Sequence, residues 1–483
     1  MTRRIPHLLS LAMLALALTA TPASAAVITV TTTADENGTG AECSLREAIR
    51  SANENSAVGG CASGSAGLDS IVLPSGTYSL SIGPAGDDLG QSGDLDVLEE
   101  LTINGGGTPS TIINGAQLDR VFDVLATAMT VTITDITITG GKTETDQNGG
   151  GIDVDSGTLR LERVHLTGNH ADNFGGAIHD NEGILLISDG AITNNVALDD
   201  SGGIDHIDGN PLTPSVLTNV TVSGNSSGTA TTEGWGGGIG ASNPMTLNNV
   251  TIVGNTVVNA GGSDYGGGGL AAPNPPSPVT ISNSLIAGNT APTGPDCYLT
   301  VNSGGYNLVG NGTDCAIAPG PGDQIGTGAA PIDPLVGPLA DNGGPTPTHA
   351  LLKGSPAING GNPAAPGSGG SACAANDQRG LARNCDIGAY ELVFCQRVAV
   401  NRIGTSGKDN LKGTPGPDGM LGFGGNDRLA GKAGKDGLCG GPGKDTLKGG
   451  GGKDRLDGGP GKDLCVGQAG RDKARKCERE KTI

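Results

Sequence analysis

The apolar positions of this chain recur in two registers, and the longer one occupies the middle of the sequence. Six stretches share one pattern, in which apolar residues stand eight and three positions before the last residue. Glycine runs that end in an aliphatic residue separate the stretches. The alternation predicts strands, and a unit of 26 to 34 residues is too short to bury its own apolar face, so the units must stack. The stretches are 131–141, 159–169, 185–195, 215–225, 245–255 and 279–289.

Stacked units of this kind predict an all-β fold, a right-handed parallel β-helix whose coils lie about 4.8 Å apart. The inward aliphatic residues then form continuous columns. The glycine runs mark corners where a Cβ would clash or where φ must be positive. Five stretches end in asparagine, which predicts a structural amide ladder because stacked asparagines satisfy turn backbone groups. These residues are Asn169, Asn195, Asn225, Asn255 and Asn289.

A short amphipathic helix is expected near the start of the region 27–130. Ser44 stands at its N-cap and Glu47 three positions later, which is the spacing of a capping box. An open end of a β-helix exposes apolar columns and strand edges, so the helix is expected to cover that end. Strands are expected at 27–33, 70–73, 77–82, 101–103 and 111–113.

From Gly404 the period changes to nine residues. A glycine, an aspartate two positions later and a core residue two positions beyond that recur eight times without a slip. Glycines let carbonyl oxygens converge, and oxygen-only ligands suit a hard cation. The aspartates are Asp409, Asp418, Asp427, Asp436, Asp445, Asp454, Asp463 and Asp472.

This tail resembles the RTX-type nonapeptide G-G-x-G-x-D-x-U-x. The resemblance implies a parallel β-roll in which these eight aspartates and nearby carbonyls bind Ca²⁺ between stacked turns. The tail also departs from the pattern, because Lys or Arg precedes most aspartates and a paired leading Gly-Gly occurs only at 440–441, 449–450 and 458–459. Two interpretations stay open. One is calcium binding that is weak or confined to the copies from Asp436 to Asp463, and the other is a metal-free solenoid in which Lys and Asp neutralise each other.

Charge divides the chain into two parts. From Arg397 onward 18 Lys and Arg face 11 Asp and Glu, a net charge of +7, whereas residues 27–395 hold 9 basic and 38 acidic residues, a net charge of −29. The acidic body argues against a nucleic-acid partner, because phosphate binding needs a basic surface. The basic tail has two interpretations: binding of anionic envelope or glycan polymers, or solubility with attraction to its own body.

Residues 1–26 predict a secretory signal peptide, with two arginines, an apolar run at 8–18 and a small-residue cleavage site at 23–25. No later apolar run approaches the roughly 18 residues of a transmembrane helix, so an extracellular or cell-surface location is expected. All ten cysteines follow the signal, which favours disulfides over metal thiolates. Proximity suggests the pairs Cys43 with Cys61, Cys297 with Cys315 and Cys373 with Cys385, and leaves Cys395, Cys439, Cys465 and Cys477 open.

Two further resemblances concern residues 27–391. The stretch CSLREAIRSAN at 43–53 resembles the CSLREA motif of bacterial exported β-helix proteins, and the glycine-run units resemble, more loosely, the repeats of polymorphic outer-membrane adhesins. These resemblances imply a fold and a secreted or surface location, and no reaction. From the residues alone, the Pro- and Gly-rich segment 290–391 is expected to be a disulfide-stapled cap over the far end. Four stretches of this segment resemble the choice-of-anchor Q domain: GPLADNGGPTPTHALL at 337–352, GSPAI at 354–358, DQRG at 377–380 and DIGAYE at 386–391.

Parallel β-helices also carry polysaccharide lyases and glycosidases, whose chemistry needs clustered carboxylates. Asp153, His179 and Asp205 each follow a glycine run and would form a column suited to acid and base roles. The next two coils place Gly240 and Ala271 there, and nine basic residues leave little in the body to bind an anionic sugar. A structural interpretation of the column is therefore preferred. An aromatic column of Phe174, Trp235 and Tyr265 is interpreted either as a sugar platform or as corner packing.

The sequence thus favours an exported, non-enzymatic protein with a calcium-binding tail and a role in binding or adhesion. The alternatives are a carbohydrate-active enzyme, either a polysaccharide lyase or a glycoside hydrolase, and a purely structural surface protein. The expected segments are the signal peptide 1–26, the N-terminal cap and first coils 27–130, the β-helix repeats 131–289, the anchor-like cap 290–395 and the nonapeptide tail 396–483.

Overall fold

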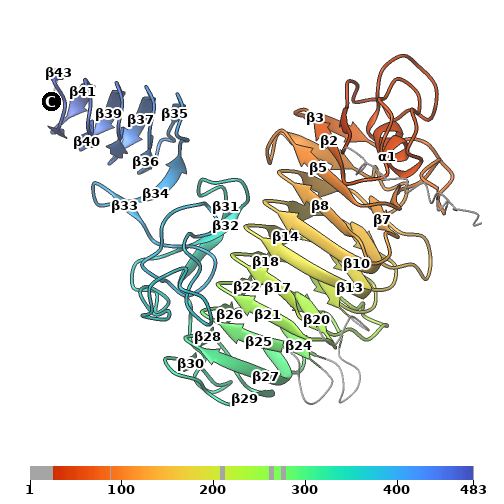
Figure 1. The fold of residues 1–483 in the computed structure, drawn as a ribbon. Helices are drawn as coiled ribbons and strands as arrows, with labels where there is room; N and C mark the ends of the chain where they lie inside the picture. The colour runs from red at the N-terminus through yellow and green to blue at the C-terminus, as the bar shows by residue number, and fades with distance from the viewer. Residues whose placement is uncertain (1–24, 87–88, 207–212, 260–265, 273–278, 482–483) are drawn as a thin grey trace, which may run out of the picture.

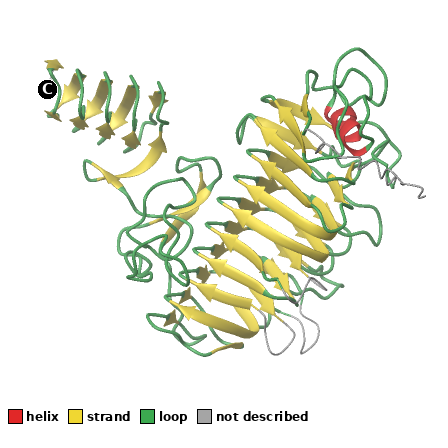
Figure 2. Ribbon diagram, in the orientation of Figure 1, coloured by secondary structure: helices red, strands yellow, loops and turns green. Residues whose placement is uncertain are grey.

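A long β-solenoid is followed by a shorter one in the computed structural model, which describes residues 25–86, 89–206, 213–259, 266–272 and 279–481 (Figure 1). Strands make up nearly all of the regular structure of these residues, with the single helix α1 (Leu45–Asn53) (Figure 2). The predicted signal peptide lies outside the described residues except for its last two positions.

Two long sheets of parallel strands form the walls of the β-helix, and a short third sheet completes the coils. In the described residues the first sheet has 16 strands: β1 (Val27–Thr29), β2 (Asp69–Leu73), β4 (Leu95–Val97), β5 (Leu101–Gly105), β7 (Phe122–Val124), β8 (Thr130–Thr134), β10 (Ile152–Glu162), β13 (Ile178–Ser188), β16 (Ile204–His206), β17 (Ser215–Thr218), β20 (Ile239–Ala241), β21 (Met245–Asn248), β24 (Leu270–Ala272), β25 (Val279–Ser282), β27 (Cys297–Gly305) and β29 (Cys315–Ile317). The second comprises β3 (Gly76–Ser79), β6 (Thr111–Asn114), β9 (Thr137–Thr139), β11 (His165–Thr167), β14 (Ala191–Thr193), β18 (Thr221–Ser223), β22 (Thr251–Val253), β26 (Leu285–Ala287), β28 (Leu308–Val309) and β30 (Gln324–Ile325). The third comprises β12 (His170–Ala171), β15 (Val196–Ala197), β19 (Ser226–Ser227) and β23 (Thr256–Val257).

Parallel pairing keeps each unit in register with the next. Leu161 pairs with Ile133 of the preceding coil and with Ile187 of the following one, and all three are at most 3 % exposed. A slip of one residue would turn these side chains outward, so the apolar alternation fixes the register. The stacked, buried columns confirm the predicted parallel β-helix.

The predicted amide ladder is present at the corner that follows the second sheet. Asn225 Oδ1 accepts the backbone N–H of Asn195 at 3.0 Å, and Asn225 Nδ2 donates to the carbonyl of Ile192 at 2.9 Å. The same bonds recur from Asn169 to Asn289, where Asp296 takes the place of the next asparagine. The ladder therefore satisfies corner backbone groups that are closed to water.

Helix α1 lies at the N-terminal end of the β-helix and contacts β2 and β4 (Figure 1). The expected capping box is present, because Ser44 Oγ accepts the N–H of Glu47 at 3.2 Å and Glu47 Oε2 accepts the N–H of Ser44 at 3.1 Å. The apolar face of the helix joins the main core. Helix and first coils are thus one packed unit.

The sequence suggested that the segment after the last repeat caps the far end of the β-helix. In the structure it does not lie across that end. It first continues the coils through β27–β30, and from about residue 331 it runs back along the second sheet, where β31 (Val336–Ala340) and β32 (Thr348–Leu351) pair antiparallel. Gln378 Oε1 accepts the hydroxyl of Thr221 at 2.6 Å, well before the last coil. Hydrogen bonds to corner residues of the β-helix, together with an apolar cluster of Leu285, Leu308, Leu351 and Ile387, hold the segment against this flank.

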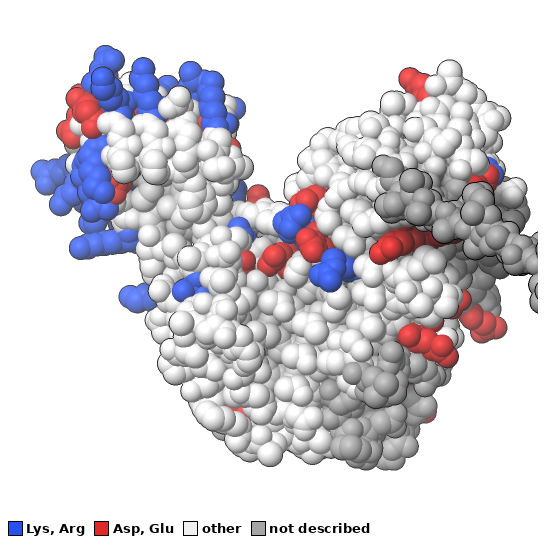
Figure 3. Space-filling view, in the orientation of Figure 1, with Lys and Arg blue, Asp and Glu red and all other residues white. Residues whose placement is uncertain are grey.

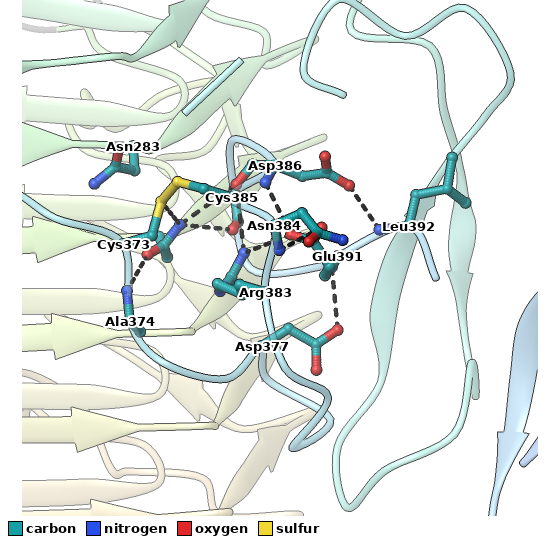
Figure 4. A network of polar contacts seen from close by, with 12 residues as sticks. Asn283, Cys373, Ala374, Asp377, Arg383, Asn384, Cys385, Asp386, Glu391 and Leu392 are labelled. Carbon is teal, nitrogen blue, oxygen red and sulfur yellow. Dashed lines mark hydrogen bonds and ion pairs between the residues drawn. A yellow bond between two sulfur atoms is a disulfide. The ribbon is translucent and has the colours of Figure 1, made fainter. Parts of the chain in front are cut away.

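A buried network of polar contacts holds the flank segment together (Figure 4). Asp386 Oδ2 accepts the N–H of Leu392 at 2.6 Å, and the Glu391 carboxylate accepts the N–H groups of Asn384 and Asp386 at 2.9 and 2.8 Å. Arg383 Nη2 donates to Asn219 Oδ1 on the β-helix at 2.9 Å. The acidic residues of the DIGAYE motif are therefore engaged in holding the fold.

The tail is a narrower solenoid whose alternate repeats pair in two separate parallel sheets. The predicted apolar positions form its core, where Met420, Leu447 and Cys465 are fully buried. One sheet comprises β33 (Phe394–Cys395), β34 (Val398–Ile403), β36 (Gly419–Leu421), β38 (Gly437–Cys439), β40 (Arg455–Asp457) and β42 (Lys473–Arg475), with β33 antiparallel to β34. The other comprises β35 (Asn410–Lys412), β37 (Arg428–Gly434), β39 (Thr446–Gly452), β41 (Leu464–Gly470) and β43 (Arg479–Lys481).

Disulfides use all ten cysteines of the described residues. Three are the pairs that proximity along the chain suggested. The bond between Cys395 and Cys439 joins the start of the tail to β38, and the last bond closes its C-terminal turns. The pairs are Cys43–Cys61, Cys297–Cys315, Cys373–Cys385, Cys395–Cys439 and Cys465–Cys477.

Candidate functional site

The aspartates of the tail stack in two columns, one for odd and one for even repeats. Residues 18 positions apart lie in neighbouring turns of the roll, as the bonds from Asp427 to Asp445 and from Asp436 to Asp454 show. From Asp418 to Asp472 each of these aspartates is at most 8 % exposed. Such burial is unusual for a residue type that normally stays at the surface unless it is paired.

From Asp427 onward the two oxygens of each carboxylate have different surroundings. Oδ1 accepts the backbone N–H of the aspartate one turn earlier, as in Asp445 Oδ1 with Asp427 N at 2.8 Å. Oδ2 is buried without a hydrogen-bond partner in six consecutive repeats. Buried charged oxygens are costly unless a partner compensates them. The six residues are Asp427, Asp436, Asp445, Asp454, Asp463 and Asp472.

A glycine leaves space beside five of these oxygens, from Asp427 to Asp463. The point where a Cβ would stand on Gly440 is 2.4 Å from Asp445 Oδ2 and 2.6 Å from the carbonyl oxygen of Gly458 in the next turn. The same arrangement recurs at Gly431. A side chain would fill this space, which lies between a carboxylate and a carbonyl oxygen. Oxygen donors of these two kinds are the ligands that Ca²⁺ prefers, so the residues fit the ion.

The first two repeats differ from the other six. Asp409 Oδ2 accepts the N–H and the hydroxyl of Thr405 at 2.6 and 3.1 Å, and Asp418 Oδ2 accepts the same groups of Thr414 at 2.6 and 3.0 Å. Threonine thus satisfies the oxygen that elsewhere has no protein partner. The sequence could have predicted that these two repeats differ, because threonine follows the leading glycine only in them.

The carboxylates are electrostatically costly without a cation. Burial raises the pKa of Asp436 and of Asp445 to about 6, against the opposing effect of a backbone N–H on each. The preceding lysines do not relieve this cost, because Lys435 and Lys444 are exposed and the described tail has no Lys–Asp ion pair within 4.0 Å. Lysine and arginine side chains instead spread over the surface of the tail (Figure 3). The ion pairs between Lys and Asp that the metal-free interpretation requires are therefore absent from these residues.

Comparison with known families agrees with this geometry. Residues 403–438 and 440–474 match the family model of the RTX calcium-binding nonapeptide repeat. The match covers most of the second solenoid and supports calcium binding by the tail. No curated protein matches the chain. In the described residues no helix has the length and hydrophobicity that a membrane span requires.

The column proposed for the β-helix body comes together and is longer than the sequence suggested. Asp153 pairs in register with His179, and His179 with Asp205. Asp123 and Asp96 continue the column toward the N-terminus. The alignment of the repeats does not include these two aspartates, because their coils differ in length. A repeated triplet in the sequence does mark them: Leu95-Asp96-Val97, Phe122-Asp123-Val124 and Ile152-Asp153-Val154.

The predicted acid and base candidates are in contact but closed to solvent. His179 Nδ1 lies 2.7 Å from Asp153 Oδ1, and His179 Nε2 lies 3.8 Å from Asp205 Oδ2. Burial lowers the pKa of His179, but the hydrogen bond and charge of Asp153 outweigh it, and the net pKa is raised. His179 and Asp205 are 5 % and 1 % exposed, so a sugar chain does not reach both in this conformation. The arrangement favours a structural role.

The aromatic residues pack against this column. The ring centroids of Phe174 and His179 are 6.4 Å apart, and the Trp235 ring lies 3.0 Å from the point where a Cβ would stand on Gly240. Glycine at that slot therefore makes room for the indole. These contacts favour corner packing over an exposed sugar platform. The third member, Tyr265, lies outside the described residues.

Two buried carboxylates of the body predict a pH-dependent stability. Burial raises the pKa of Asp205 to about 6 against the opposing charge of His179, and burial with the charges of Asp199 and Asp205 raises the pKa of Asp200 to about 8. Because both are raised above the unfolded value, their contribution is full below about pH 4 and is lost as pH rises through about 6 and 8. We expect calcium-free protein to melt at a higher temperature at pH 5 than at pH 8. One pKa unit is about 1.4 kcal/mol, so Asp205 alone contributes roughly 2–3 kcal/mol over its whole titration, of which about half is lost between pH 5 and pH 8.

The matching variant is Asp205→Asn, which resembles the protonated acid and keeps an acceptor for the Ser201 hydroxyl, now 2.6 Å away. It should be more stable than wild type at both pH values, with a larger margin at pH 8, because wild type regains part of the contribution of Asp205 at pH 5. Glu182→Gln, at an exposed position of β13, is the control and should change neither value. Equal melting temperatures of wild type at the two pH values would contradict the prediction.

Proposed function

We propose that this chain is an exported, non-enzymatic β-helix protein whose calcium-loaded tail binds anionic polymers of a cell envelope or of surface glycans. One observation carries the proposal: a single small solenoid combines six buried carboxylate oxygens that have no hydrogen-bond partner with a surface of lysine and arginine side chains. The long acidic β-helix would act as the spine that displays this tail.

Calcium is assigned to the six repeats with a buried, unpartnered Oδ2, from Asp427 to Asp472, and not to Asp409 or Asp418. From Asp427 to Asp445 each ion would lie between that oxygen and a glycine carbonyl of the next turn, and at Asp463 between that oxygen and the carbonyl of Lys476. When bound, Ca²⁺ supplies positive charge that compensates the buried carboxylates. The exposed Lys and Arg side chains then make the electrostatic potential at the surface of the tail positive, so calcium loading would strengthen attraction to polyanions.

A groove along one face of the tail gives the polymer a place to lie. It has a cavity volume of about 680 Å³ and is lined by Lys435, Lys453 and Arg471 over a floor of glycine backbone. These cations are 18 residues apart, so each belongs to a successive turn, at steps of about 4.8 Å. An even row of charges beside a flat floor suits an extended chain with regularly repeated acidic groups.

The proposed location is extracellular or at the cell surface. The predicted signal peptide supports export, and five disulfides fit an oxidising compartment. The resemblances to the CSLREA motif and to the choice-of-anchor Q domain point to the same location. The segments that end at residues 26, 130, 289, 395 and 483 remain our proposed domain organisation, with the coils themselves continuing through β30.

Retention on a sulfated-polysaccharide resin tests the binding role. In millimolar calcium the double variant Lys435→Glu, Lys453→Glu should bind about tenfold more weakly than wild type, because each exposed ion pair is worth up to about 1 kcal/mol. The control is Lys412→Glu, Lys448→Glu, which changes charge equally at exposed positions of β35 and β39 outside the groove. Equal loss in both variants would mean that only net charge matters, and no retention of wild type would refute the role.

A further inference from the structure

We propose that Asp94, Asp96 and Asp123 form a separate Ca²⁺ site in the first coils of the β-helix, far in sequence from the tail. One carboxylate oxygen from each residue lies within 4.8 Å of the other two. Asp96 and Asp123 are adjacent in register on β4 and β7, and Asp94 comes just before β4. The inference goes beyond the proposed function and does not depend on it.

The spacing of the three oxygens suits calcium. Ca²⁺ binds about six to eight oxygens at about 2.3–2.6 Å, so two ligands of one ion are at most about 5 Å apart. The three oxygens lie within that limit. Mg²⁺ demands near-ideal octahedral geometry and usually keeps several waters, so carboxylates fixed on two strands and a loop favour the more flexible coordination of Ca²⁺. The donor atoms are all oxygen, and no softer ligand belongs to this group of described residues.

The local charge calls for a cation beyond the one that the protein provides. Arg120 is shared among three carboxylates, at 3.4 Å from Asp94, 3.1 Å from Asp123 and 2.8 Å from Asp153. Asp94 is only 4 % exposed, and its Oδ1 is buried without a hydrogen-bond partner. A buried carboxylate oxygen in that condition is costly, and a cation in contact with it removes the cost.

Hydrogen bonds from helix α1 hold the loop before β4, which carries Asp94, in place. Arg46 of α1 is fully buried and donates to the carbonyls of Gly93 and Asp94 at 2.8 and 2.7 Å. Asp96 accepts the backbone N–H of Gly90. Arg46, which is not a ligand, and the bond from Gly90 to Asp96 therefore fix the loop before β4, which preorganises the carboxylates. Bound calcium would in turn tie this loop to β7 and so close the first coils.

Hydrogen exchange measured by mass spectrometry on the full mature chain tests the site, because each peptide reports its own region. Peptides covering 89–97 and 119–124 should exchange at least about tenfold more slowly in calcium than in calcium-free buffer, with little effect of magnesium. In the double variant Asp94→Asn, Asp123→Asn this slowing should be lost. Tail peptides should keep their own calcium response, which separates this site from the tail.

The control is Asp155→Asn, which removes an exposed carboxylate from the neighbouring strand β10 and should keep the wild-type response in both regions. If calcium does not slow exchange in the two body peptides of wild type, the cluster is balanced by protons and the proposal is wrong. Slowing that persists in the double variant overturns it as well. The comparison of calcium with magnesium needs no variant, so it decides the question even if the double variant fails to fold.

Discussion

Chelation of calcium from the mature protein is expected to unfold the tail, residues 404–474, and to leave the β-helix folded. Without calcium the roll would bury six carboxylates whose Oδ2 has no partner, against a core cluster of only six buried side chains. One site at a hundredfold excess of ligand over Kd contributes about 2.7 kcal/mol. Several such sites together match the whole stability of a typical domain, about 5–15 kcal/mol, so their loss should be decisive.

Circular dichroism and limited proteolysis during chelation measure the effect, and the body supplies an internal reference. Asp445→Asn, in the middle of the roll, should weaken calcium binding by about tenfold or more. Asp409→Asn is the matched control and should behave like wild type, because Thr405 already satisfies that oxygen. A tail that keeps its strands and its protease resistance without calcium would contradict the assignment.

Much of the fold could be predicted because it is written as a repeat. In a solenoid each residue faces its equivalent in the next coil, so aligning the copies gives columns directly, and Leu161, Asn225 and Leu447 lie where the alignment placed them. The flank segment could not be placed in this way. Its position depends on contacts such as Arg383 with Asn219, which join residues 164 positions apart and belong to no repeat.

The candidate sites differ in the same way: the one that lies in regular repeats could be predicted from the sequence, and the other could not. The tail aspartates were visible because their spacing is strictly nine, whereas the division into six and two depends on the threonines of the first repeats. The cluster of Asp94, Asp96 and Asp123 was missed, because the first coils differ in length and Asp94 lies outside any repeated position. A repeated triplet marks Asp96 and Asp123 in the sequence, but nothing there joins them to Asp94 in the loop before one of the strands.

Replacement of one ladder asparagine, Asn225→Ala, is expected to destabilise the β-helix strongly. It removes the acceptor of the Asn195 backbone N–H and the donor to the Ile192 carbonyl, and Asn225 is 0 % exposed. Water cannot replace these bonds, and each buried polar group left unpaired costs about 1–3 kcal/mol. We therefore expect the free energy of unfolding to fall by about 3–5 kcal/mol, measured by urea denaturation in calcium.

Asn194→Gly provides the matched control at the preceding residue. Asn194 is exposed and has a φ of 56°, and the equivalent positions of other coils hold glycine, as at Gly224 and Gly254. Its replacement relieves a left-handed backbone while adding freedom to the unfolded chain, so the net change should stay within about 1 kcal/mol. Hydrogen exchange should localise the damage of Asn225→Ala to the amides of the neighbouring corners. Similar small losses in both variants would show that the coils are held by their apolar columns alone, with the amide ladder following the stack instead of stabilising it.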